Sequence, residues 1–161
     1  MPSYRGEMRE KAIEYLIQAS QRAVQRSANV EAINHLTKGL EVLKTLPEAP
    51  ERIQQELTLQ ITLGVPLTAT KGYGAPETGK AYARARELCR QVGETPQLFP
   101  VLRGLWMFHL VRGVMSLSRL LQQQGKQEKA RQMLAEIYDW FSEGFDTADL
   151  KQAKALLEAL S

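Results

Sequence analysis

The stretch whose residue types come nearest to phosphate chemistry is TKGYGAPETG, from Thr70 to Gly79. Glycines beside a lysine are the materials of a loop whose backbone N–H groups hold a phosphate. A dinucleotide-binding turn needs the pattern GxGxxG, but Glu77 stands where the third glycine belongs. A Walker loop needs serine or threonine after its lysine, but Lys80 is followed by Ala81. We therefore expect a turn between two helices, with glycines that supply positive φ and close packing.

The remaining residues of chemical interest do not form a reactive set. His35 and His109 are far apart in the sequence and have no acidic companion at ligand spacing, so we expect no metal site. Cys89 has no histidine near it, and it lies where a helix would bury its face. We interpret it as a small apolar core residue and not as a nucleophile. The sequence thus predicts no catalytic residue, no cofactor-binding residue and no enzyme activity.

The composition is that of an ordinary soluble domain. Of 161 residues, 43% are hydrophobic and 24% are charged, and the net charge is only +3, so we expect no nucleic-acid partner. A single cysteine excludes an intramolecular disulfide. The apolar runs look shorter than the ~20 residues of a membrane span, and the polar N-terminus is unlike a signal peptide. These features predict a cytoplasmic protein without a membrane partner.

The elements that must position these residues are helices. Apolar side chains recur at steps of three and four residues along most of the chain. The pattern predicts an all-α domain over 1–161 with about seven helices: a first hairpin at 1–46, a second at 50–93, and a long helix plus a terminal hairpin at 96–161. Pro66 should kink the helix that contains it. We favour one continuous helix from about Gln97 to Gln124 over a turn at Gly113, because its apolar stripe keeps one phase throughout.

A repeat pattern runs through these hairpins. In tetratricopeptide repeats, the second helix of each hairpin carries a small residue, a large residue and another small residue, so that neighbouring helices approach closely. Two segments fit this pattern, Ala32, Leu36 and Gly39, and Thr78, Tyr82 and Ala85; a third has Ala130 and Leu134, with Ile137 in place of the second small residue. The pattern favours a short α-solenoid of antiparallel hairpins.

Longer stretches carry a closer resemblance. EKAIEYLIQASQRAVQRSANVEAINHLTKGLEVLKTLP, GYGAPE followed by AYARARELC, and WFSEGFDTADL resemble the tetratricopeptide-like C-terminal region of large bacterial signalling ATPases of the STAND type. In these proteins the ATPase often follows a cyclase or kinase domain. The resemblance implies a sensing or interaction module without the catalytic part. It also implies an internal shortening, because VRGVMSLSRLL joins two stretches that further repeats usually separate.

We therefore expect a non-catalytic module that binds a protein or peptide partner, without cofactors. Repeat spacing would place seven residues in its groove: Gln21, Gln25, Thr68, Val101, Leu105, Phe108 and His109. A second hypothesis is a self-associating homodimer, whose contact would involve Val114, Leu117, Leu121, Trp140 and Phe141. Its premise is that a long helix keeps the last hairpin away from the first four helices. A third is a small-molecule or nucleotide binder that uses the TKGYG stretch.

Overall fold

The chain forms a row of helices and contains no strand within the residues that the computed structural model describes, 4–93, 95–141 and 148–159. The seven helices are α1 (Tyr4–Gln25), α2 (Asn29–Lys44), α3 (Pro50–Lys71), α4 (Pro76–Val92), α5 (Leu98–Gln123), α6 (Gln127–Phe141) and α7 (Ala148–Ala159). This confirms the predicted all-α class and the number of helices.

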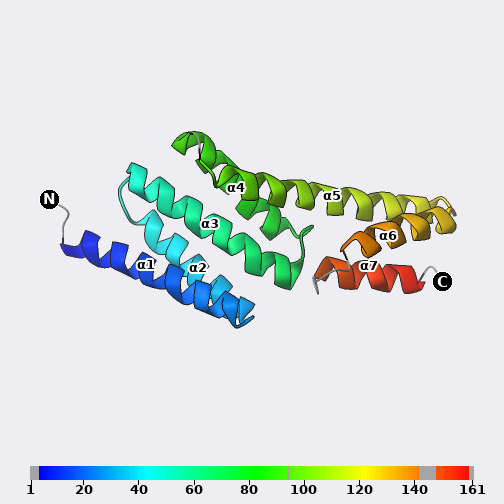
Figure 1. The fold of residues 1–161 in the computed structure, drawn as a ribbon, viewed down its shortest axis with the longest axis horizontal. Helices are drawn as coiled ribbons and strands as arrows, with labels where there is room; N and C mark the ends of the chain where they lie inside the picture. Colours follow the sequence, from blue (N-terminus) through cyan, green and yellow to red (C-terminus); the bar gives the residue numbers. More distant parts are fainter. Residues whose placement is uncertain (1–3, 94, 142–147, 160–161) are drawn as a thin grey trace.

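Consecutive helices pack side by side as antiparallel hairpins (Figure 1). Each helix from α1 to α6 contacts the next one, and the first helices of successive hairpins also touch, α1 against α3 and α3 against α5. This arrangement is that of a short α-solenoid, in which each hairpin buries its apolar face against its neighbours.

Two apolar clusters hold the row together. One joins α1, α2 and α3 around Ile13, Leu36 and Leu59, and the other joins α3, α4 and α5 around Leu57, Leu88 and Val101. The small and large residues of the repeat pattern all lie in the interior: Ala32, Leu36, Gly39, Thr78, Tyr82, Ala85, Ala130 and Leu134. The predicted repeat register therefore gives the correct buried face of α2, α4 and α6.

Glycines let the hairpins approach where aromatic rings fill the interior. The Tyr82 ring of α4 lies between Gly64 of α3 and Gly104 of α5, and a Cβ at either glycine would stand 2.5 Å from that ring. Gly79 leaves room in the same way for the ring of Phe108. The close-packing role expected of Gly79 is thus confirmed, and Gly72 ends α3 with a φ of 97°.

Helix α5 runs without a break through Gly113, as predicted. Its 26 residues span about 39 Å at 1.5 Å per residue. Helix α3 is also assigned as one helix, with Pro66 inside it. The run before the TKGYG turn is therefore helical and not a strand.

The terminal helix corrects one expectation. We expected α5 to keep the last hairpin apart from the first four helices, but α7 contacts α3. The chain reverses at the end of α5, so that α6 runs back beside α5, and α7 lies on the other side of α6 (Figure 1). The C-terminal hairpin is thus joined to the N-terminal half of the molecule.

Candidate interaction site

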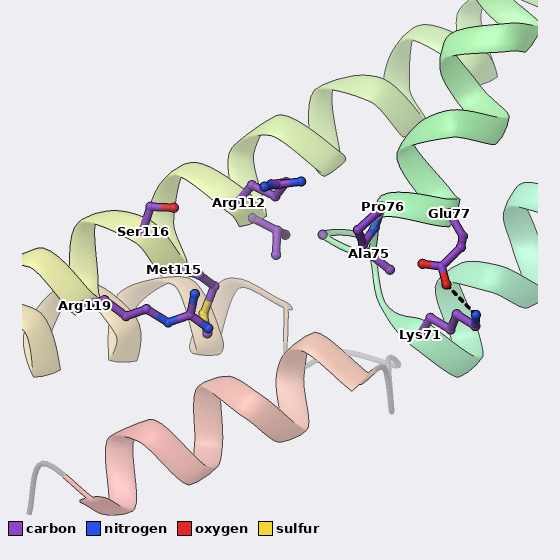
Figure 2. Close-up of a pocket in the computed structure, with 10 residues that line it drawn as sticks. Lys71, Ala75, Pro76, Glu77, Arg112, Met115, Ser116 and Arg119 are labelled. Carbon is purple, nitrogen blue, oxygen red and sulfur yellow. Dashed lines mark hydrogen bonds and ion pairs between the residues drawn. The ribbon is translucent and has the colours of Figure 1, made fainter.

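A cleft of about 490 Å³ lies between the α3–α4 turn and the middle of α5. Figure 2 shows Lys71, Ala75, Pro76 and Glu77 on one side and Arg112, Met115, Ser116 and Arg119 on the other. The cleft is lined by residues of the TKGYG stretch, so the nucleotide-binding hypothesis would place its ligand here.

The residues of this turn are already engaged with each other. The Lys71 Nζ atom lies 2.6 Å from Oε1 of Glu77, and this hydrogen bond is the main reason that the pKa of the Glu77 carboxyl is lowered. Glu77 is also in the first turn of α4, where a negative charge is favourable, and Pro76 beside it has no N–H to offer. In a phosphate loop, the lysine and the N-terminus of the helix would both face the phosphate. Here Lys71 and the N-terminus of α4 face the carboxylate of Glu77.

The α5 side of the cleft is cationic. The Arg112 guanidinium lies over the Phe108 ring, 5.5 Å from its centroid, and Arg119 is a further exposed arginine. This wall can attract an anionic group at the surface. The described lining residues hold no set for nucleophilic or acid–base catalysis, since the one carboxylate among them is paired with Lys71. The cleft can bind, but its described residues give no mechanism for a reaction.

A second feature is an apolar surface on the outer side of α5. Five large side chains are partly or mostly in solvent: Phe99 (75% exposed), Leu102 (44%), Trp106 (53%), Leu117 (46%) and Leu120 (49%). At 100° per residue they fall within an arc of about 60°. We call these five residues the outer stripe. It lies opposite the face that Val101 and Gly104 turn towards the core.

Three of the predicted groove residues are in the interior, so their assignment was wrong. Val101 and Leu105 belong to the cluster around Tyr82, and Thr68 is buried with its hydroxyl donating to the Gly64 carbonyl at 2.8 Å. Because α5 is apolar on two faces, the repeat spacing selected the face that packs on α4.

The other four groove residues do not form one surface. Gln21 and Gln25 are exposed on α1, and His109 is exposed on α5, while Phe108 is half-buried against Gly79. Helices α1 and α5 lie on opposite sides of the row (Figure 1). The predicted groove is therefore not assembled as expected.

The predicted self-association residues are also divided. Leu117 is exposed, whereas Val114 and Leu121 are half-buried on other faces of α5. The side chains of Trp140 and Phe141 lie outside the described residues. Only Leu117 of this set contributes to the outer stripe.

The histidine and cysteine candidates, His35 and Cys89, are not part of a reactive or metal-binding group among the described residues. His35 does have an acidic companion, contrary to the expectation from the sequence, because its Nε2 atom lies 3.4 Å from Oε1 of Glu31 one turn away in α2. Cys89 is buried as predicted, and its burial raises the pKa of the thiol. Among the described residues, no three histidine, cysteine, aspartate or glutamate side chains are grouped as metal ligands.

Helix α5 also modifies the expectation about membranes. In the described part of the chain it is the one helix long and apolar enough to cross a membrane, judged by length and composition alone. Only 22% of its most apolar window is buried. This result reflects the outer stripe, which adds a second apolar face to the one in the core.

Comparisons with known proteins give no relative. No family model, no curated protein and no solved structure matches the chain. The resemblance to the C-terminal regions of signalling ATPases stays a prediction.

Sequence reasoning missed part of both surfaces. Phe99 was not assigned to any surface, and Arg112 and Arg119 were not assigned to a cleft. Leu102 and Leu120 belong to the apolar stripe whose constant phase predicted one continuous helix, and neither was assigned to a contact surface. A usable signal was present, because α5 has apolar residues on opposite faces and only one of them can face α4.

Proposed function

We propose that the chain is a non-catalytic helical-repeat module for protein–protein interaction, and that the outer stripe of α5 is its contact surface. The observation that carries the proposal is the exposure of Phe99 and Trp106 beside three leucines on one face of a single helix. Exposed apolar patches of several hundred Å² on soluble proteins are often functional and can mark sites of association.

The chemistry of the surface fits a helical partner. A rigid helix that exposes an apolar stripe about 60° wide offers the same surface as one side of a helix–helix contact. Aromatic anchors such as Trp106 and Phe99 supply much of the binding energy in such contacts. The engaged Lys71–Glu77 pair favours this role over nucleotide binding at the TKGYG turn.

A selection experiment tests the proposal. The full chain, immobilised at low density, is used to select amphipathic helical peptides from a displayed library. Selected peptides should bind the wild-type chain and lose at least about tenfold in affinity for Trp106→Glu, because a charge would stand in the centre of the contact. Binding to a matched variant, Tyr15→Glu at an exposed aromatic position on α1, should be unchanged.

A second experiment tests whether the outer stripe binds lipid membranes. Neutral and anionic phospholipid vesicles are mixed with the wild-type chain and with Trp106→Glu. Sedimentation of the wild type alone would mean that the stripe binds membranes, which would overturn the protein-interaction proposal. The protein-interaction proposal would also be overturned if every selected peptide bound Trp106→Glu as tightly as the wild type.

A further inference from the structure

We infer that the partner of the outer stripe is a second copy of this chain, with the two α5 helices packed antiparallel about a two-fold axis near His109 and Leu110. This inference rests on the proposed function, since it names the partner of the same surface. It differs from the homodimer predicted from the sequence, because Val114 and Leu121 lie off the contact.

Gly113 lies in the same arc of α5 as the outer stripe, and with Gly113 included the spacing along this face is the same in both directions. The positions are Phe99, Leu102, Trp106, Gly113, Leu117 and Leu120, separated by three, four, seven, four and three residues. In an isologous contact, residue i of one copy meets residue j of the other, and j meets i. An axis between His109 and Leu110 therefore pairs Phe99 with Leu120, Leu102 with Leu117, and Trp106 with Gly113.

The sizes of the paired residues are complementary. Trp106 is the largest side chain of the stripe, and it meets the residue with no side chain. A Cβ built at Gly113 has no heavy atom within 4 Å, so this position is open to a side chain from outside. Two such insertions, related by the axis, would fix the register of the contact. In a parallel arrangement, Trp106 would face its own copy.

The charges are also compatible with the antiparallel register. Helix α5 carries three arginines and no acidic residue. The same axis places Arg103, which borders the stripe, opposite the uncharged Ser116 of the other copy. In this register none of the three arginines of α5 stands opposite another arginine, so the contact brings no like charges face to face.

The area available suits a dimer of moderate affinity. A buried aromatic side chain covers ~150–250 Å², so the exposed parts of Phe99 and Trp106 together offer roughly 250 Å² per copy. The exposed leucines bring the apolar total to roughly 500 Å², before polar neighbours at the edge are counted. Stable interfaces bury about 800 Å² per partner, so this smaller apolar area corresponds to a weak dimer, which we expect at micromolar and higher concentrations.

Moving the tryptophan along the stripe tests the register. The molecular mass of the full chain is measured by sedimentation equilibrium over a micromolar concentration series. Trp106→Ala removes the inserted side chain and Gly113→Trp fills its site, so each should weaken the dimer at least about tenfold. The double variant Trp106→Ala/Gly113→Trp places a tryptophan opposite a small residue again and should regain most of the wild-type affinity.

Two controls distinguish this result from a change in folding and from nonspecific association caused by an added tryptophan. Ala83→Trp adds a tryptophan at an exposed helical position of α4 and should leave the dimer constant unchanged. Circular dichroism should show the same helix content for all variants, since positions 106 and 113 lie on the exposed side of α5.

The outcomes are distinct. A wild-type chain that is monomeric throughout overturns the inference, and so does a dimer that ignores substitutions on the stripe. A double variant no tighter than the single ones overturns the antiparallel register. If the wild type is monomeric but selected peptides still require Trp106, the proposed interaction function stands and its partner is another protein.

Discussion

At the scale of single residues, Tyr82 shows how an aromatic side chain links three helices. Its ring occupies the space left by Gly64 and Gly104, and its hydroxyl forms a hydrogen bond with Thr68. Burial raises the pKa of the phenol above its usual value and outweighs the opposite effect of that hydrogen bond. The folded chain therefore favours the neutral phenol.

This preference predicts a loss of stability at alkaline pH. Below the pKa of an unfolded tyrosine, about 10, both states hold the proton and Tyr82 adds no pH dependence. Above it the unfolded chain loses a proton that the folded chain keeps, so the free energy of unfolding falls as pH rises towards the folded pKa. In Tyr82→Phe the free energy of unfolding should fall less over this pH range. Near pH 8 the variant should be less stable than the wild type by about 1 kcal/mol, because it lacks the hydrogen bond of the Tyr82 hydroxyl.

Urea unfolding of both chains between about pH 8 and pH 11 measures the effect. The difference in unfolding free energy between wild type and Tyr82→Phe should narrow as pH increases. Two curves that stay parallel would mean that Tyr82 ionises equally easily in both states. The comparison cancels the contribution of lysines and of the other tyrosines.

At the scale of the elements, α5 contains two helical glycines with opposite surroundings. A Cβ at Gly104 would stand 2.5 Å from the Tyr82 ring, which Gly64 confines on its other side, whereas a Cβ at Gly113 would meet nothing. Alanine at either position gains the same helix propensity, ~1 kcal/mol. The difference between the two substitutions therefore reports the packing of α5 on α4 and α3.

We predict that Gly113→Ala stabilises the monomer by ~0.5–1 kcal/mol and that Gly104→Ala is less stable than Gly113→Ala by ~1–3 kcal/mol. Denaturant unfolding at a concentration where the chain is monomeric measures both values. Equal stabilities would show that the Tyr82 ring moves aside without a cost in free energy and that glycine is not required at position 104.

The elements also show what the sequence can and cannot predict. Apolar spacing located all seven helices and the continuity through Gly113, because both depend on local periodicity. It failed for Val101 and Leu105, since a helix that is apolar on opposite faces does not reveal which face meets its neighbour. The contact of α7 with α3 was missed because it joins segments far apart in the sequence.

At the scale of the whole molecule, the helices differ in how many neighbours support them. Helix α3 is central and packs against α1, α2, α4, α5 and α7. Among the described residues, the main contacts of α7 are with α6 and α3, and those of α6 are with α5 and α7. In solenoids, stability is approximately a sum of repeat and nearest-neighbour terms. The C-terminal hairpin should therefore open before the centre of the row.

Native-state hydrogen exchange at low denaturant tests this order. Amides of α2, α3 and α4 should exchange only by global unfolding, because opening them breaks both apolar clusters. Amides of α6 and α7 should exchange through a partial opening at least about 1.4 kcal/mol less costly, which corresponds to tenfold faster exchange. The proposed dimer contact lies on α5 and should protect neither helix of the hairpin. One common exchange rate across α2 to α7 would mean that the contact between α7 and α3 couples the ends of the row into a single cooperative unit.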